Sequence, residues 1–517
     1  MSQIDRFVIR AKPAVHVGPG AIGELPGIVL AAGADQVVVV TEEALATAPV
    51  IETVMTVLAD AGLSARLFAG VHPVPTPADL AGGADAVAEA AADAATTAAA
   101  SASAAAVAAM LRPSAPLVAP THPSGPHPVL RPLAPSQPSG PHPVLRPSEP
   151  SGSHPVLRPS EPSPPSSPHP AFRSSAPFDD PPPPPGPPGP FRSPASSQPS
   201  GPHRVLYPST APPALAGPRI VLVAVGSGAP IDAAKGIAIA AASPPPGWDP
   251  DARPDGTVPA LPIVAVPVAT GTGAETSAVG LIADPAGGRT FCVGHDGTMP
   301  AAAILDPELT AGLAPAVIAA GGLDTLTRAL ESYLALRPNP WSDGIALQVI
   351  RMVAASLPRA VMDGTDLAAQ SQLLLAAHIA GVATASTGLG LCHAIGRSVC
   401  TRWDVARGAA LAMLLPEVLR FNLPARLGRM ADVAFALGVG DTHADTWPNA
   451  EAAIGAITAL CDDVGLNRLM SDVGVTEADF GQICADALAD ESLASTPRPP
   501  TEADIHAILL TISGHPR

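Results

Sequence analysis

The hydrophobic pattern of the first hundred residues alternates between short continuous runs and helically spaced positions. The run Gln36 to Val40 (QVVVV) is continuous and β-branched, as in a strand that is buried on both faces. Helical spacing follows over residues 49–62, and a short strand is expected around residues 65–68. Residues 81–110 are rich in alanine, and at least the first part of this segment is expected to be helical. Strand, helix and strand in this order predict the beginning of a parallel α/β layer.

The same alternation resumes after residue 219 and then stops. Two continuous apolar runs, Ile220 to Val225 (IVLVAV) and Leu261 to Val268 (LPIVAVPV), predict buried strands, and Pro230 to Ala241 predicts a helix between them. From about Pro307 onward helical spacing dominates and no long β-branched run occurs. The expected fold is an α/β N-terminal domain followed by an all-helical C-terminal domain.

Proline content separates a third segment from these two. Of the 66 prolines in this chain of 517 residues, 36 fall between Pro113 and Pro218. The hexapeptide HPVLRP occurs there three times, at His127, His142 and His154. These repeats are too irregular and too rich in proline to stack as a solenoid, so a disordered surface insertion is expected. A proline-rich docking segment for a partner protein is the alternative interpretation.

The domain prediction follows from these boundaries. Residues 1–110 and 219–305 are expected to form the α/β domain, 111–218 the disordered proline-rich insertion, and 306–517 the helical domain.

Charge and cysteine content narrow the environment of the protein. The formal net charge is −17, and an acidic body repels both nucleic acid and anionic membranes. The five cysteines include no C-x-x-C pair, which is typical of a reduced cytoplasmic chain. No apolar run reaches the 18 or so residues that a membrane span needs, and the N-terminus lacks the apolar core of a signal peptide. We therefore expect a cytoplasmic protein without a membrane anchor.

Two loops at the ends of predicted strands carry candidate ligand-binding groups. Gly226-Ser227-Gly228 follows a buried strand and opens a helix, so its backbone N–H groups could cradle a phosphate. The second loop, Ala269 to Glu275 (ATGTGAE), follows another buried strand, and two such loops at strand ends indicate a ligand crevice. Glu42, just beyond the QVVVV run, could accept hydrogen bonds from a ribose diol and would repel a 2′-phosphate, which favours NAD over NADP. A tight turn without a ligand and a solvated loop acid are the alternatives.

Six ordered motifs carry a resemblance to a known family. They are AVGSGAPIDAAK from Ala224, PVATGTGAE from Pro267, ILDPEL from Ile304, GLDTLTRALESY from Gly322, GLGLCHAIGR from Gly388 and RGAALAMLLPEVLRFN from Arg407. In this order and context the chain resembles the iron-containing alcohol dehydrogenase family, which shares the dehydroquinate synthase-like fold. The resemblance covers nearly the whole chain except the proline-rich segment. It implies a dinucleotide-binding α/β domain, a helical domain that carries a metal ion, and a cleft between them.

The resemblance assigns cofactor positions to particular residues. The cofactor-binding candidates are Glu42, Gly226, Ser227, Gly228, Ala229, Asp232, Thr270 and Thr272. The family's glycine loop has three glycines and a serine, whereas this chain has Gly-Ser-Gly-Ala. Dinucleotide binding is expected to survive these differences with reduced affinity.

The metal-ligand positions of the family are only half filled in this sequence. One aspartate and one histidine fall on Asp324 and His393, but the other two histidines fall on Arg328 and Arg407. A further family histidine, which relays a proton, falls on Arg397. Arginine stays protonated and offers no lone pair to a metal. The resemblance therefore predicts an incomplete site that holds a divalent metal such as iron or zinc weakly or not at all.

The arginines leave two interpretations open. Asp324 and Arg328 are four residues apart on a helix and could simply pair with each other. Alternatively Arg328, Arg407 or Arg397 could grip an anionic substrate or polarise a carbonyl group. His393 is the best remaining general acid or base, and the predicted catalytic residues are these three arginines and His393.

These predictions combine into an NAD(P)-dependent oxidoreductase that interconverts a small-molecule alcohol and an aldehyde or ketone. Its metal dependence is expected to be weak or lost, an anionic substrate is a corollary, and a homodimer remains open. A non-catalytic relative that binds nucleotide and recruits a partner through the proline-rich segment is the alternative. A sugar-phosphate cyclase ranks last, because that family's extra lysines and histidines around the substrate are missing here.

Overall fold

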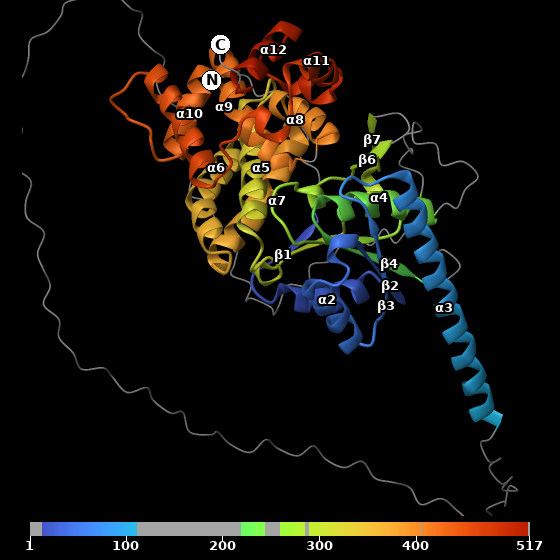
Figure 1. The fold of residues 1–517 in the computed structure, drawn as a ribbon. Helices are drawn as coiled ribbons and strands as arrows, with labels where there is room; N and C mark the ends of the chain where they lie inside the picture. Colours follow the sequence, from blue (N-terminus) through green and yellow to red (C-terminus); the bar gives the residue numbers. More distant parts are fainter. Residues whose placement is uncertain (1–12, 111–218, 243–258, 285–288, 404, 515–517) are drawn as a thin grey trace, which may run out of the picture. The chain divides into compact units, whose positions relative to one another are not determined.

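A computed structural model describes residues 13–110, 219–242, 259–284, 289–403 and 405–514, all of which belong to one compact unit (Figure 1). The segment predicted to be a disordered insertion lies outside the described residues. The predicted domain boundaries stay a prediction, although the two kinds of structure do follow one another along the chain as expected.

The N-terminal part is built on a sheet of six parallel strands. In spatial order they are β1 (Ala14–Val17), β8 (Ala302–Leu305), β5 (Ile263–Pro267), β4 (Ile220–Gly226), β2 (Gln36–Glu42) and β3 (Ser64–Val71). Val38 lies opposite Leu222, and Leu222 lies opposite Ile263, so the three continuous apolar runs are neighbours at the centre. The predicted parallel α/β layer is confirmed.

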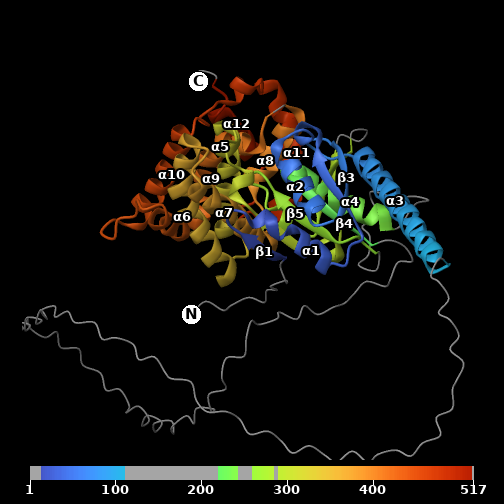
Figure 2. The ribbon, with the colours of Figure 1, turned by 90° about the horizontal axis from the view of Figure 1, so that it is seen from below.

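The central strands are apolar throughout because helices cover both faces of the sheet. Val38 and Val40 pack on one face with α3 (Pro77–Met110) and α4 (Gly228–Ala242). Their chain neighbours Val37 and Val39 pack on the other face, where α1 (Leu25–Ala31) and α2 (Pro49–Asp60) lie. Successive strand residues point to opposite faces, so only a continuous apolar run can fill both layers. Figure 2 shows these helices on either side of the strands.

Some elements were not predicted from the pattern. The edge strand β1 and its neighbour β8 carry four residues each, too few for a clear period. An antiparallel hairpin of β6 (Gly280–Asp284) and β7 (Arg289–Val293) also went unrecognised. Helix α3 covers the whole alanine-rich segment rather than only its first part.

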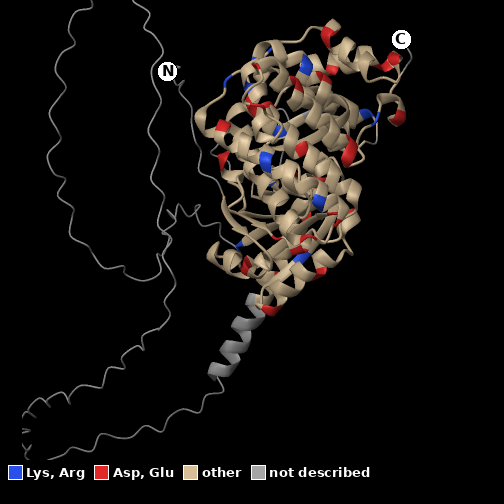
Figure 3. Cartoon of the chain, turned by 90° about the vertical axis from the view of Figure 1, so that its left-hand side faces the viewer, with Lys and Arg blue, Asp and Glu red and all other residues tan. Residues whose placement is uncertain are grey.

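The C-terminal part is helical, as predicted. Its helices are α5 (Pro315–Leu334), α6 (Pro340–Met362), α7 (Leu367–Thr387), α8 (Leu391–Arg402), α9 (Arg407–Ala436), α10 (Thr446–Asp463), α11 (Phe480–Ala489) and α12 (Glu502–Thr511). Helix α5 packs against α6, α7 and α9, and nearly all of its residues from Ile318 onward are buried. Polar side chains on α5 are therefore held in an interior environment. Figure 3 marks the positions of the acidic and basic residues along the described part of the chain.

Two described helices, α6 and α7, are long and apolar enough to cross a membrane by length and composition alone. In the structure they pack against each other and against α5. Their apolar residues thus contribute to the core of the helical part, for example Val353 and Leu373.

The C-terminal end of α5 is held by two arginines from α9. Pro424 lies within α9, and Arg426 departs from helical geometry just after it. Arg426 donates from Nε to the Leu334 carbonyl at 3.1 Å and from Nη2 to the Ala335 carbonyl at 3.0 Å. Arg429 donates from Nε to the Tyr333 carbonyl at 2.7 Å. Cations at this end also complement the helix dipole, so α9 fixes the end of α5.

Replacing Arg426 by alanine should destabilise the protein, because the last carbonyls of α5 lose charged donors. We expect the free energy of unfolding to fall by about 1–3 kcal/mol, measured by urea denaturation. The matched control is Arg420→Ala in the same helix, whose guanidinium pairs with Glu417 near the surface. This control should cost less than about 1 kcal/mol. Equal losses in the two variants would show that Arg426 does not secure α5.

Candidate active site

The predicted glycine loop joins β4 to α4 and has little room for side chains. Gly226 has a φ of 148°, and a Cβ added to it would lie 2.7 Å from Cγ of Pro230. A Cβ on Gly228 would lie 2.6 Å from Cγ2 of Thr272. Glycine is therefore required at both positions, and the two predicted loops lie in direct contact.

Glu42 lies beside the glycine loop, as the sequence suggested. Its Oε1 accepts a hydrogen bond from the Ser227 backbone N–H at 3.3 Å. The carboxylate ends β2 next to β4, so parallel pairing of the two strands brings it to the loop. Its role toward a ribose diol stays a prediction.

The second loop connects the glycine loop to the helical part. Thr272 accepts a hydrogen bond at Oγ1 from the Ala274 backbone N–H at 3.2 Å. A Cβ on Gly271, whose φ is 124°, would lie 3.3 Å from Cβ of Asp324. A Cβ on Gly321 would lie 2.3 Å from Oγ1 of Thr270. Thus small residues on both sides allow this loop to lie directly on α5.

Asp232 is positioned by the buried Lys235 one turn further along α4. The Lys235 ammonium donates to Asp232 Oδ1, to the Ala274 carbonyl and to the Val279 carbonyl, each at 2.9 Å. Because two of these contacts join α4 to the second loop and its continuation, Lys235 acts as a structural tie. Asp232 itself lines the cavity described next.

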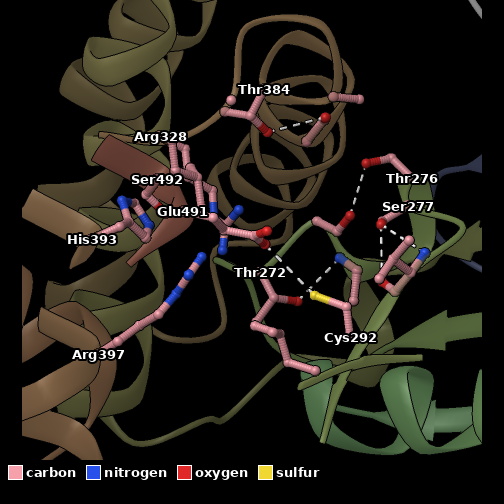
Figure 4. Close-up of a pocket in the computed structure, with 18 of the residues that line it drawn as sticks. Thr272, Thr276, Ser277, Cys292, Arg328, Thr384, His393, Arg397, Glu491 and Ser492 are labelled. Atoms are coloured by element: carbon pink, nitrogen blue, oxygen red, sulfur yellow. Dashed lines mark hydrogen bonds between the residues drawn. The ribbon is translucent and has the colours of Figure 1, made fainter. Parts of the chain in front are cut away.

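A cavity of about 550 Å³ lies between the α/β and the helical parts (Figure 4). Of the predicted site residues, six line it: Asp232, Thr272, Arg328, His393, Arg397 and Arg407. The rest of the predicted set, including Glu42, the glycine loop, Ala229, Thr270 and Asp324, lies outside the lining.

Asp324 is the centre of a buried ionic cluster. Arg328, one turn along α5, donates from Nε to Asp324 Oδ1 at 2.9 Å. Arg407, the first residue of α9, donates from Nε to Oδ2 at 2.8 Å, and its Nη2 lies 2.6 Å from the same oxygen. Nε2 of His393 lies 3.3 Å from Oδ1. The pairing of Asp324 with Arg328 that the spacing suggested is present, and Arg407 joins it.

The electrostatics of this cluster keep the aspartate ionised. Burial by itself would raise the pKa of Asp324, but the charges of Arg407 and Arg328 outweigh it and hold that pKa well below its usual range. Burial lowers the pKa of Arg328. Burial is also the largest effect on the pKa of Arg407, but the charge and the hydrogen bond of Asp324, with smaller effects of Cys400 and Asp232, together outweigh it and raise that pKa. Two guanidinium charges therefore face one carboxylate charge.

Glu331 was not recognised from the sequence, yet it positions His393. Its Oε2 lies 2.6 Å from Nδ1 of His393 and accepts a hydrogen bond from the Gly390 N–H at 2.8 Å. Its Oε1 accepts from the Cys392 N–H at 2.7 Å. Burial would raise the pKa of Glu331, but His393 and these hydrogen bonds lower it. The seven-residue spacing from Asp324, two turns of one helix face, was the available signal.

His393 therefore lies between two carboxylates. Nδ1 faces Glu331 and Nε2 faces Asp324, and the side chain is 1% exposed. Only an imidazolium can donate from both ring nitrogens at once. The geometry thus favours His393 as a proton donor at Nε2 over a role as a lone-pair donor to a metal.

Arg397 also lines the cavity and is paired with Asp490. Its Nη1 donates to Oδ1 and Oδ2 of Asp490 at 3.1 and 2.9 Å. Figure 4 shows its side chain extending toward the middle of the cavity. Glu491 and Ser492, in the short 3₁₀ helix Glu491–Ser495, also line the cavity and were missed from sequence, because this segment shows no periodic pattern.

The donors around Asp324 do not fit a divalent metal ion. Among the described residues, no group of three or more His, Cys, Asp and Glu side chains is arranged to hold one. Both oxygens of Asp324 accept from guanidinium groups, and those arginines occupy two of the four expected ligand positions. No step of the chemistry is therefore assigned to a metal here.

The two loops fit a dinucleotide better. The N-terminus of the 15-residue helix α4 opens at Gly228, and a Cβ on either loop glycine would fill the space beside it. A helix N-terminus preceded by glycines suits a pyrophosphate group, although the first residues of α4, Gly228 to Pro230, are themselves buried.

Comparisons with known proteins agree with this arrangement. Residues 217–307 match the family model "Iron-containing alcohol dehydrogenase", and residues 318–513 match "Fe-containing alcohol dehydrogenase family, C-terminal". The "Probable alcohol dehydrogenase EutG" of Escherichia coli is 38% identical over 277 residues, which cover 54% of this chain and 69% of that protein. The "NAD-dependent methanol dehydrogenase" of Bacillus methanolicus is 33% identical over 288 residues, which cover 56% of this chain and 76% of that protein.

A solved structure extends the similarity to the whole fold. The crystal structure of a 1,3-propanediol oxidoreductase superposes with a TM-score of 0.70 at 25% identity, covering 98% of this chain and all of that one. Both the sequence matches and the architecture lead to the same assignment. The chain belongs to the iron-containing alcohol dehydrogenase family.

Proposed function

We propose that this protein is an NAD-dependent oxidoreductase that interconverts an alcohol and an aldehyde or ketone without a firmly bound metal ion. Family membership and the alcohol dehydrogenase names of the relatives support alcohol–aldehyde oxidoreduction on a small molecule. The proposal that no metal ion is firmly bound rests on one observation, the cluster of Asp324, Arg328, Arg407 and His393.

The cofactor would lie over the glycine loop and the second loop. The N-terminus of α4 and the glycines at 226 and 228 would receive the pyrophosphate, and Glu42 would accept from the ribose diol. The bound nicotinamide supplies or accepts a hydride. The contact between Gly271 and Asp324 supports a position for the reacting carbon beside the ionic cluster.

His393 would move the proton in this reaction. In the direction of reduction, Nε2 gives its proton to the oxygen that becomes an alcohol, while Glu331 holds Nδ1. In the direction of oxidation the same nitrogen accepts the proton from the alcohol.

Arg328 and Arg407 would provide the electrostatic stabilisation that a metal ion provides elsewhere in the family. Guanidinium N–H groups of Arg328 and Arg407 would stabilise the negative charge that develops on the carbonyl oxygen during reduction. Asp324 prevents these side chains from moving away, because it accepts from both. The guanidinium forks of these arginines also match an anionic group on the substrate through two parallel hydrogen bonds.

Chelation should leave the activity of the purified protein unchanged. After dialysis against EDTA, we expect elemental analysis to find no stoichiometric iron or zinc and NADH oxidation to proceed at the original rate. The reason is that arginines stand at two of the expected ligand positions. Metal retained through dialysis, together with loss of activity on chelation, would contradict this prediction.

Replacing Glu42 by glutamine should reduce the preference for NADH over NADPH. The carboxylate repels a 2′-phosphate and an amide does not, so NADPH binding should tighten relative to NADH in a fluorescence titration. Glu43→Gln is the matched control, because Glu43 is exposed and follows directly in the chain. A cofactor preference that is the same in both variants would rule out a role for Glu42 in it.

Replacing His393 by glutamine should lower kcat by about 10²–10⁴-fold, because the proton donor is lost. Binding of NADH should persist, since the cofactor loops are untouched. His72→Gln serves as the control, because that exposed histidine pairs with Asp79 at the start of α3. An unchanged kcat in the His393 variant would exclude its role as general acid.

A further inference from the structure

The two arginines on Asp324 retain hydrogen-bond donors that the protein does not use. Arg328 gives only Nε to Asp324, and among the described residues its Nη1 and Nη2 have no acceptor. Arg407 uses Nε and Nη2, and within the same part of the chain its Nη1 has none. Both side chains line the cavity, and that of Arg328 is only 11% exposed. Donors held in so enclosed a place favour a ligand that supplies oxygen acceptors.

The arginines of the cavity differ in how they are paired. Arg328 and Arg407 both pair with the single carboxylate of Asp324. Arg397 instead donates to both oxygens of Asp490. The carboxylates of Asp232 and Glu491 also line the cavity. Arg328 and Arg407 are therefore the two arginines that share one carboxylate, and their remaining N–H groups can bind an anion.

The distance between the two guanidinium groups and the proton donor, Nε2 of His393, limits how far the anionic group of the substrate can lie from its carbonyl group. Arg328 and Nε2 of His393 contact the same oxygen of Asp324, at 2.9 and 3.3 Å. A carbonyl group that receives its proton from His393 must therefore lie close to the guanidinium groups. Only a substrate whose carboxylate is attached directly to the carbonyl carbon, without a spacer, can place the carboxylate on the guanidinium groups and the carbonyl oxygen at Nε2 of His393 at the same time.

We propose that Arg328 and Arg407 bind the carboxylate of a 2-oxo acid, and in the reverse direction that of the corresponding 2-hydroxy acid. This inference rests on the proposed function and names its substrate class. In the reaction the carbonyl carbon accepts a hydride from reduced nicotinamide and the C=O π bond breaks. The oxygen then takes one proton from Nε2 of His393, which solvent later restores. A 2-oxo acid, NADH and one proton thus give a 2-hydroxy acid and NAD⁺.

The first experiment tests the anion site without catalysis. Oxalate, a planar dicarboxylate, is titrated into the full-length protein by calorimetry in the absence of cofactor. We expect saturable binding that Arg407→Met weakens about 10- to 100-fold and that Arg407→Lys weakens less, because lysine keeps the charge but loses the fork. Arg402→Met is the control, since Arg402 pairs with Asp486 away from the cavity and should leave oxalate binding unchanged.

The second experiment tests how close the carboxylate of the substrate must lie to its carbonyl group. NADH oxidation is measured with glyoxylate, with acetaldehyde as its neutral counterpart, and with succinic semialdehyde, whose carboxylate is separated from the aldehyde by two methylene groups. We expect kcat/KM for glyoxylate to exceed both others by about 10- to 100-fold, and Arg407→Met to remove this advantage. Arg328→Lys gives a second, charge-conserving variant in case the methionine variant does not fold.

The outcomes separate the two proposals. Oxalate binding that depends on Arg407, without turnover of any carbonyl compound, would support the anion site and overturn the proposed oxidoreductase function. Turnover of acetaldehyde at least as efficient as that of glyoxylate, with no binding of oxalate, would overturn the 2-oxo acid site alone. A preference for succinic semialdehyde would also overturn it and would move the anion contact toward Arg397.

Discussion

The site depends on the contacts of the Asp324 carboxylate with the guanidinium groups of Arg328 and Arg407 and with the imidazole of His393. A lone carboxylate this deeply buried would be costly, and so would either guanidinium without it. Arg328, Arg407 and His393 come from three different helices, so the cluster joins α5, α8 and α9 at one point. Removing one member would leave charges unpaired in the interior, which makes the arrangement all-or-none.

The ionic cluster requires a rigid helix α5, and contacts fix this helix at several points along its length. Its side chains include both Asp324 and Glu331, which bracket His393 from two sides. Its C-terminal carbonyls accept from Arg426 and Arg429, and glycines near its start admit the second loop. A helix fixed along its length can keep a histidine between two carboxylates within hydrogen-bonding reach.

Close backbone contacts connect the cofactor loops to this cluster. Gly228 meets Thr272, and Gly271 meets Asp324, in each case with no space for a Cβ. The glycine loop, the second loop and the ionic cluster are thus consecutive layers of one packed structure. In a family member that uses a metal at this position, the ion supplies the positive charge. In this chain the positive charge belongs to arginine side chains that are packed into the site.

The sequence by itself determined the fold class and the identity of most groups in the site. Continuous β-branched runs can only be satisfied in a sheet covered on both faces, so β2, β4 and β5 were predictable. The replacement of two histidines by Arg328 and Arg407 was equally visible, because it is a matter of residue type.

Only the tertiary structure decided how these groups combine. That Arg407 joins Arg328 on one carboxylate, that Glu331 holds His393, and that Asp490 pairs with Arg397 depend on contacts across 62 to 93 residues of chain. Short edge strands and the 3₁₀ segment from Glu491 carry no periodic signal and were missed for the same reason. Sequence pattern reports local preference, whereas the hydrogen-bond partners of a buried charge are set by packing between distant elements.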